Sequence, residues 1–446
     1  MRTRLQPVVF LALAAIAAAS MWFYVIGILR AHQIADAQIK QIPRGNLSDL
    51  YPRWLGTREL LLHHRNPYGR EVTLEIQEGY YGRRLDPVRP NDPKDQQGFA
   101  YPVYVVFLLA PLAGVPFPVL LVVFYWLLAV LTAASVWLWL RVLRWRLPGI
   151  AVATCIVLTL GCFPAVQGIK LQQLSLLVAA LLAGAAASVA SRFLFLGGVL
   201  LGLATIKPQL AWLIVAWLLL WAVSDWRARR KLVYGFGIVM ALLLAGAEII
   251  LPGWWRWFAE GIRQYHQYTQ NQSVLEVMLS GLLGPVASGT AGHIGGQILA
   301  VIAVLACSPL LWRLRREQLD AGGFGCAIAL VLALTVLVVP MYAPYNQLLL
   351  LPAILLLARQ RSAFLSQSLV RRLAYLAGVL VVGWQWAASL GLTATYFLVS
   401  RAWTLNSWTW PFFATFALPV WVCGLIFFCV KDAPRPVPGG GFAKVN

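Results

Sequence analysis

Charged residues are scarce in this chain. Only 12% of its 446 residues are Asp, Glu, Lys or Arg, whereas a soluble globular protein has about 25%. Hydrophobic residues make up 60% of the chain, and the mean hydropathy is +0.72. This composition excludes an ordinary soluble domain, and we therefore expect a protein that crosses a membrane several times.

Other absences exclude further classes of function. The six cysteines show no C-x-x-C spacing, so we expect neither a disulfide framework nor a cysteine metal site. No nucleotide-binding fingerprint occurs. No Asp or Glu occurs from residue 96 to residue 224, while nine of the 16 carboxylates lie in residues 31–97. Carboxylate chemistry, if the protein performs any, therefore belongs to this early polar segment.

The positive charge is distributed in a pattern typical of membrane proteins. The net charge of +20 comes largely from short Lys/Arg clusters between apolar segments, and cytoplasmic loops carry such clusters. We therefore expect no nucleic-acid partner. The clusters are MRTR at the start, 141–146, 225–231, 313–317 and the arginines between 359 and 372. Placing all of them in the cytoplasm puts residues 31–97 outside, as the first outer loop.

Continuous apolar segments recur along the chain and predict helices rather than barrel strands. They lie near residues 8–30, 101–118, 119–140, 147–165, 171–190, 193–206, 208–223, 233–251, 294–312, 324–340, 344–358, 372–391 and 411–430. The predicted fold is all-α: an integral membrane, polytopic bundle of about 11–13 transmembrane helices. Over residues 101–140 the sequence shows two apolar segments, whereas the charge bias requires an odd number of membrane crossings. The first segment is therefore expected to be a half-span or a re-entrant piece, and the sequence does not decide between these.

The organisation predicted along the chain is simple. Residues 1–430 form one transmembrane domain, and residues 431–446 form a flexible cytoplasmic tail. The first segment continues past Ala19, a possible signal-peptide cleavage site, and we expect a retained anchor. In the outer loop, Leu47, Leu50, Trp54 and Leu61 recur at helical spacing, which predicts an amphipathic helix over 50–62 at the membrane surface.

Unusual polar residues fall on the same side as this loop. By the predicted topology, GIKLQQLS (168–175), IKPQ (206–209) and MYAPYNQLLLLPA (341–353) all lie at the outer face. Lys170 and Lys207 belong to no cytoplasmic cluster. A lysine at a broken helix end is suited to a phosphate group, although it can also extend to the interface without any ligand.

Four sequence elements resemble those of a known family, the GT-C superfamily of polytopic glycosyltransferases and, within it, family 87. They are Ser48-Asp49-Leu50 with Asn66-Pro67-Tyr68, then Phe99-Ala100-Tyr101-Pro102, then Gln172-Gln173-Leu174-Ser175 with GGVLLGLATIKPQ, and Tyr345-Asn346-Gln347. The resemblance covers about residues 40 to 360. The chain departs from the family pattern at Gln172, where glycine is common, at Ser175, where asparagine is common, and at Asn346, where an acid is common.

The resemblance implies a reaction and a set of site residues. The family transfers a sugar, often mannose, from a polyprenyl-phosphate donor to a lipid or glycan hydroxyl, with inversion, at the outer face of the bacterial inner membrane. By resemblance Asp49 is the general base. A carboxylate beside a helix start can also have a purely structural role, in which it stabilises the helix through the helix dipole. The implied substrate-binding residues are Lys207, Lys170, Gln172, Gln173, Tyr101, Tyr345, Asn346 and Gln347. No cofactor is expected, and the sequence leaves open whether a divalent metal assists.

Two other classes of membrane protein fit parts of this pattern. A lipid or sugar transporter would place polar residues through the midplane and show an internal repeat, and we find no convincing repeat. A surface-polysaccharide ligase or polymerase would rely on arginine and histidine in a late outer loop, here Arg256, Arg263, His266 and His293. A scaffold would leave the outer-face lysines unexplained.

Overall fold

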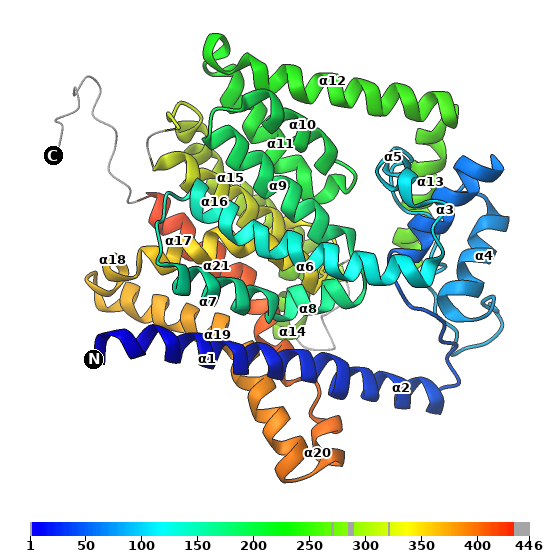
Figure 1. Cartoon of the computed structure of the whole chain (residues 1–446), viewed down its shortest axis with the longest axis horizontal. Helices are drawn as coiled ribbons and strands as arrows, with labels where there is room; N and C mark the ends of the chain where they lie inside the picture. Colours follow the sequence, from blue (N-terminus) through cyan, green and yellow to red (C-terminus); the bar gives the residue numbers. More distant parts are fainter. Residues whose placement is uncertain (1, 269–271, 284–289, 320–321, 432–446) are drawn as a thin grey trace.

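The computed structural model describes residues 2–268, 272–283, 290–319 and 322–431. Within these ranges every regular element is a helix, which confirms the predicted all-α fold. The elements form one elongated bundle, with the N-terminus at one end and the helices of the first outer loop at the other (Figure 1). The predicted cytoplasmic tail lies outside the described residues beyond Lys431.

Six helical stretches are long and apolar enough to cross a membrane, or up to seven if a bent pair counts as one span. The six comprise α1 (Arg2–Phe23) continuing through η1 (Tyr24–Leu29) and α2 (Arg30–Ile39), then α6 (Phe117–Val142), α12 (Trp226–Ile250), α15 (Thr290–Leu314), α19 (Leu369–Leu398), and α20 (Arg401–Asn406) with η4 (Trp410–Phe412) and α21 (Phe413–Lys431). The bent pair is α7 (Gly149–Leu160) and α8 (Phe163–Lys170), at 58°.

The remaining apolar segments form helices shorter than a full span. Five have 10 to 17 residues: α9 (Leu174–Ala190), α10 (Leu194–Ala204), α11 (Pro208–Val223), α14 (Val274–Leu283) and α16 (Gly323–Val338). The other short helices are α17 (Leu351–Arg359), α18 (Arg361–Leu365) and the 3-10 turn η3 (Pro344–Leu350). The sequence predicted about 11–13 transmembrane helices, some of them short or broken. In the structure, six or seven helical stretches have the length of a full span, and the other apolar helices are shorter.

Residues 101–140 contain one long helix rather than two. The first predicted segment forms only α5 (Val105–Leu109) and a 3-10 turn, η2 (Ala110–Leu112), and the next helix starts at Phe117 directly after Pro116. Proline lacks an N–H and fixes φ, so it suits a helix start but interrupts a helix interior. A single long helix in this region satisfies the odd number of crossings that the charge bias requires.

The basic clusters meet one another at one end of the bundle. Arg229 donates to the carbonyls of Arg315 (3.1 Å) and Glu317 (3.0 Å), and Arg359 donates to the carbonyl of Leu143. These bonds connect the clusters in two pairs, 225–231 with 313–317 and the arginines of 359–372 with the segment 141–146. The helices α3 (Tyr51–His63), α4 (Arg70–Tyr81), α5 and α13 (Trp254–Tyr268) gather at the opposite end (Figure 1). The predicted separation of basic loops from the first outer loop is thus present in the fold.

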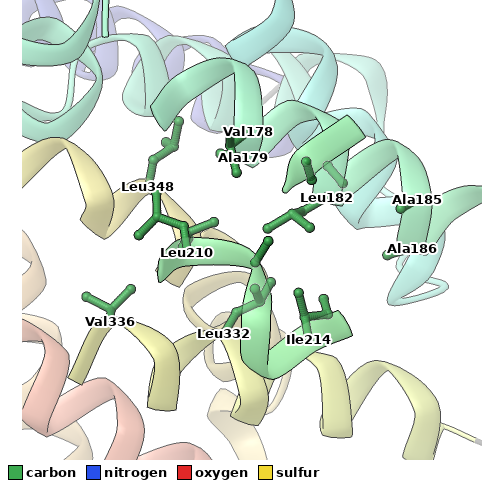
Figure 2. Close-up of a cluster of buried hydrophobic side chains, with 14 of the residues drawn as sticks. Val178, Ala179, Leu182, Ala185, Ala186, Leu210, Ile214, Leu332, Val336 and Leu348 are labelled. Atoms are coloured by element: carbon green, nitrogen blue, oxygen red, sulfur yellow. The ribbon is translucent and has the colours of Figure 1, made fainter. Parts of the chain in front are cut away.

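The core consists of aliphatic side chains from several of the short helices. Figure 2 shows α9, α11, α16 and η3 meeting through side chains that include Leu182, Leu210, Leu332 and Leu348. Glycines bring α10 against α12: a Cβ on Gly198 would lie 2.1 Å from the carbonyl oxygen of Leu232. Small residues permit such close backbone approach between membrane helices. This packing fixes the end of α10, where the Lys-Pro element follows.

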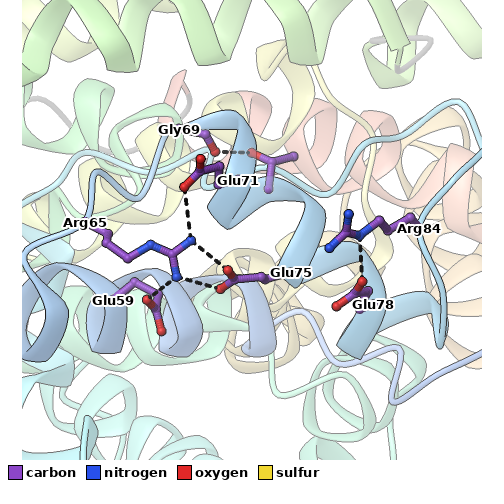
Figure 3. A network of polar contacts seen from close by, with 8 residues as sticks. Glu59, Arg65, Gly69, Glu71, Glu75, Glu78 and Arg84 are labelled. Atoms are coloured by element: carbon purple, nitrogen blue, oxygen red, sulfur yellow. Dashed lines mark hydrogen bonds and ion pairs between the residues drawn. The ribbon is translucent and has the colours of Figure 1, made fainter.

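The first outer loop folds into two packed helices. The predicted helix over 50–62 is present as α3, but its buried residues extend beyond the predicted stripe and include Thr57 and Glu59. Arg65 joins α3 to α4 because its guanidinium contacts Glu59 at 2.8 Å and Glu75 at 2.7 Å (Figure 3). The loop therefore packs on itself as a small structured cap, and the predicted position of α3 at the membrane surface stays a prediction.

Candidate functional site

A cavity of about 200 Å³ opens at the end of the bundle where the first outer loop lies. Segments far apart in the sequence form its wall: α3, the loop before α5, the turns before α9 and α11, helix α13 and the start of η3. The lining residues are Arg53, Ala100, Tyr101, Pro102, Gln173, Ile206, Lys207, Pro208, Gln209, Phe258, Ile262, Tyr265, Pro340, Met341 and Tyr345. One side of the wall is therefore polar and the other mostly apolar.

Asp49 lies directly behind this wall, at the start of α3. Its backbone N–H donates to the carbonyl of Leu171 (2.9 Å), which ties the first outer loop to the turn after α8. The side-chain amide of Gln173 donates to Oδ2 at 2.6 Å, and the Tyr80 hydroxyl donates to Oδ1 at 3.4 Å. A carboxylate has room for further donors, so Oδ1, with one long contact, can accept another hydrogen bond.

Lys207 forms the cationic part of the same wall. Its side chain is only 6% exposed, and its ammonium donates to Ser175 Oγ and, at 3.2 Å, to Gln173 Oε1. The rings of Tyr345 and Tyr101 lie 5.2 and 6.0 Å from Nζ. A lysine ammonium has three N–H donors, and these are its two hydrogen-bond acceptors among the residues that the structure describes. One donor is therefore available to a ligand.

Gln173 joins the anion and the cation through one amide. Its Nε2 donates to Asp49, and its Oε1 accepts from Lys207. Ser175 in turn donates to Oδ1 of Asn346 at 2.9 Å. The two charged groups are thus held at a fixed separation by a neutral link, and neither neutralises the other by direct contact.

Helix starts add to the positive potential of the cavity. Gln173 immediately precedes α9, and Lys207 immediately precedes α11, which begins at Pro208. The backbone N–H groups at a helix start carry partial positive charge and attract anions. Arg53 also lines the cavity, and its Nε is buried without a hydrogen-bond partner among the described residues. The geometry favours an anionic group close to Lys207.

Burial shifts both charged groups toward their neutral forms. It raises the pKa of the Asp49 carboxyl, although Arg53, the Gln173 hydrogen bond and Lys207 act in the opposite direction. It lowers the pKa of Lys207 to about 7, an effect that Arg53 increases and Asp49 opposes. Perturbed pairs of this kind are common at functional sites. A carboxylate with a raised pKa is a better base than an ordinary exposed one.

The structure brings together five of the predicted substrate-binding residues with Asp49. Lys207, Gln173, Tyr101 and Tyr345 line the cavity, and Asn346 reaches it through Ser175. The other three do not line this cavity. Gln172 accepts from Ser48 and donates to the carbonyls of Ile169 and Lys170. Gln347 donates to the carbonyl of Thr415.

Lys170 lies on the other side of the Gln-rich turn. It ends α8, and its charge interacts with those of Arg30 and Arg44 rather than with Asp49. Gln172 separates the two lysines because its backbone adopts a left-handed conformation, with φ of 51°. That conformation favours glycine, which agrees with the glycine of the related sequence pattern. The turn sends Gln172 and Gln173 in different directions, so only one of them reaches the cavity.

Three residues that contribute to the site were not predicted from the sequence. Arg53 donates to the carbonyl of Asp49 (3.1 Å) and lies over the ring of Tyr101 at 4.5 Å. The i, i+4 spacing from Asp49 was a signal for this residue. Tyr80, from α4, contacts Asp49, and Tyr265, from α13, lines the cavity. No local pattern marks these tyrosines, because only the tertiary fold brings α4 and α13 to α3.

Three of the four late-loop residues of the ligase hypothesis, Arg256, Arg263 and His293, do not line this cavity. Arg256 and Arg263 are exposed on α13, and Arg263 contacts Glu260 at 3.1 Å. His293 contacts the buried Glu276 at 3.2 Å. The side chain of His266 lies outside what the structure describes. Within the described ranges, no three His, Cys, Asp or Glu residues gather as metal ligands would.

Comparison with known proteins gives a family match. The model of glycosyltransferase family 87 matches residues 99–340, more than half of the 446 residues. The matched range contains Tyr101, Gln173 and Lys207 but begins after Asp49, so α3 and α4 lie outside it. Neither a curated protein nor a solved structure matches the chain.

Proposed function

The chain belongs to glycosyltransferase family 87, and from this premise we propose that the cavity binds a polyprenyl-phosphate sugar and that Asp49 activates the acceptor. The protein is a membrane glycosyltransferase, as its family and its spanning helices indicate. The proposed donor sugar is mannose, the acceptor is a lipid or glycan hydroxyl, and the reaction takes place at the outer face of the bacterial inner membrane.

The observation that carries the proposal is the bridge made by Gln173 between Asp49 and Lys207. Glycosyl transfer from a lipid phosphate needs a base for the attacking hydroxyl and a cation for the departing phosphate. These two groups must act on different atoms of the donor and acceptor, without pairing with each other. The Gln173 bridge keeps a carboxylate and an ammonium in one hydrogen-bond network without direct contact between them.

The proposed step is a single displacement. The acceptor oxygen forms a bond to the anomeric carbon, the bond from that carbon to the phosphate oxygen breaks, and Asp49 takes the hydroxyl proton. Lys207 and Arg53 stabilise the negative charge on the departing polyprenyl phosphate. Attack opposite to the leaving group inverts the configuration at the anomeric carbon. The apolar residues Phe258, Ile262 and Met341 line the same cavity and suit the first isoprene units.

The charge distribution of the cavity supports a phosphate donor. Arg53 has a buried Nε without a partner in the described part of the chain, and Lys207 lies at a helix start. A buried cation in such a position is stabilised by a bound anion. Membership of a glycosyltransferase family argues against the transporter and scaffold hypotheses. The ligase hypothesis predicts that late-loop histidines, rather than Asp49, carry the reaction.

The test is transfer from radiolabelled polyprenyl-phosphate mannose to membrane lipid and glycan extracts by the purified protein. Asp49→Asn keeps the shape of the side chain but removes the base, and we expect transfer to fall about 10²- to 10⁴-fold. Asp36→Asn is the matched control, because Asp36 lies in the same polar segment and pairs only with Lys40, 2.9 Å away and also exposed. Equal transfer by Asp49→Asn and wild type would exclude Asp49 as the base. The absence of transfer by the wild type would exclude this donor.

A further inference from the structure

A second cavity, of about 120 Å³, adjoins the first. Ala100 and Tyr265 line both cavities, so the two share a wall. The loop 95–99 and helix α13 supply most of the second lining. This volume is well above the roughly 10–15 Å³ that a single buried water needs, so the cavity has room for a small polar group.

The loop that lines this cavity is held rigidly. Asp95 accepts two hydrogen bonds from Gln97, one from the backbone N–H (2.9 Å) and one from Nε2 (2.8 Å). Gln77 of α4 donates to the backbone carbonyl of Gln96 (3.2 Å) and to its side-chain oxygen (2.7 Å). A site whose polar groups are fixed before binding loses less entropy when the ligand arrives.

The two cavities differ in charge. The first is lined by the cations Lys207 and Arg53, whereas the second is lined by Asp95 and Glu260 together with amide side chains, and no lysine or arginine in the described part of the chain lines it. Carboxylates and amides accept hydrogen bonds from hydroxyl groups. Trp257, 49% exposed, adds an aromatic surface. This combination suits a neutral, hydroxyl-rich ring and does not suit a phosphate.

Consecutive residues of α4 connect the second cavity to Asp49. Tyr80 donates to Asp49 Oδ1, and Tyr81 donates to the backbone carbonyl of Asp95 at 2.9 Å. The two tyrosine rings lie 4.8 Å apart. Burial raises the pKa of the Asp95 carboxyl, and Asp49 is close enough to raise it further. Asp49 and the wall of the second cavity are therefore connected through two adjacent tyrosines.

We propose that the second cavity is the acceptor site and that it binds a sugar or similar polyol ring, whose reactive hydroxyl points past Ala100 and Tyr265 toward Asp49. The proposal rests on the function proposed for the first cavity. It assigns the acceptor's head group to the class of neutral carbohydrates, and it places Trp257 and Glu260 as acceptor-binding residues. The proposal also implies that α13 helps to bind both substrates, because this helix lines both cavities.

The test compares two tryptophans of the same helix. Trp257 lines the second cavity, whereas Trp255, 55% exposed, lines neither cavity. Octyl α-mannoside serves as a sugar-headed acceptor probe, and radiolabelled polyprenyl-phosphate mannose serves as the donor. For Trp257→Ala we expect the KM for the acceptor to rise about tenfold or more, with the KM for the donor and the rate of donor hydrolysis unchanged. For Trp255→Ala we expect wild-type values.

The other possible outcomes distinguish failure of the acceptor site from failure of the proposed function. Equal acceptor KM values for the two tryptophan variants would overturn the acceptor site while leaving the proposed function intact. Donor hydrolysis by the wild type without transfer to octyl α-mannoside or to glycan extracts would overturn the carbohydrate class of the acceptor. If the wild type neither hydrolyses nor transfers from the donor, the proposed function fails and this inference fails with it.

Discussion

Helix α11 has a buried cation at each end, and the two are held differently. Arg229, near its C-terminal end, donates to the carbonyls of Trp221 (2.9 Å), Arg315 and Glu317 and lies over the Trp221 ring at 3.9 Å. The ammonium of Lys207, at the N-terminal end, contacts two side-chain oxygens and two aromatic rings within the described ranges, and it faces a cavity. Both side chains are 6% exposed, so burial alone does not distinguish them.

The difference follows from the direction of the helix dipole. Carbonyl groups at a helix end attract cations, whereas the N–H groups at a helix start repel them. Arg229 lies in the first turn of α12, but its guanidinium reaches carbonyls at the ends of α11 and α15 and stabilises the packing there. Lys207 opposes the dipole of α11 without such carbonyls, and a bound anion would stabilise it. The comparison teaches that a buried cation without backbone carbonyl partners is a stronger sign of a ligand site than burial by itself.

The largest effect on activity is expected at the N-terminal end. Lys207→Met keeps the length of the side chain and removes the charge, and we expect transfer to fall about 10²- to 10³-fold, the range for losing one group that stabilises developing charge. The melting temperature should change little, because Lys207 donates to two side-chain oxygens and to no backbone carbonyl, and the change removes a buried charge that opposes the dipole of α11. Transfer assays and thermal unfolding in detergent measure both. Unchanged transfer would remove Lys207 from the site.

The corresponding change at the other end should affect stability instead. Arg229→Met leaves the carbonyls of Trp221, Arg315 and Glu317 without this donor. The Trp221 indole still donates to Glu317, and the Ser224 hydroxyl remains beside the other two carbonyls. A hydrogen bond from a charged donor contributes about 1.5–3 kcal/mol, so we still expect a clear loss of thermal stability. The folded protein should transfer sugar at close to the wild-type rate. A large loss of transfer without a loss of stability would contradict the distinction between the two cations.

The smallest predicted effect concerns pH. Because burial lowers the pKa of Lys207 to about 7, the free enzyme loses this positive charge as the pH rises through that value. The ratio kcat/KM for the donor should therefore fall at alkaline pH. Lys207→Arg keeps the charge at all accessible pH values and should remove the alkaline fall even if its activity is lower. An unchanged alkaline fall in this variant would assign it to another group.

Much of the fold and part of the site could be predicted from the sequence. Hydropathy predicted the helices, and the Lys/Arg clusters separated the two ends of the bundle. These signals could not distinguish full spans from short helices, because α9, α10 and α11 are as apolar as α6 and differ from it chiefly in length.

At the site, the sequence predicted that Asp49, Gln173 and Lys207 belong together. The sequence could not predict which of the adjacent residues Gln172 and Gln173 lines the cavity. The left-handed backbone conformation of Gln172 determines this, because it directs the Gln173 side chain to the cavity. It also assigned Lys170 to the phosphate, whereas the fold separates this lysine from the cavity. The second cavity had no sequence signal, because it forms only where α13 packs over the loop 95–99.

The central claim is that Asp49 and Lys207, which Gln173 connects, have different roles: Asp49 activates the acceptor and Lys207 binds the donor phosphate. The most direct measurement is the donor Kd and the single-turnover transfer rate for Asp49→Asn and Lys207→Met, side by side with wild type. The account predicts that Asp49→Asn binds the donor with wild-type affinity but transfers at least a hundredfold more slowly, whereas Lys207→Met binds the donor more weakly. If both variants lose donor binding equally, or if Asp49→Asn transfers at the wild-type rate, the claim is wrong.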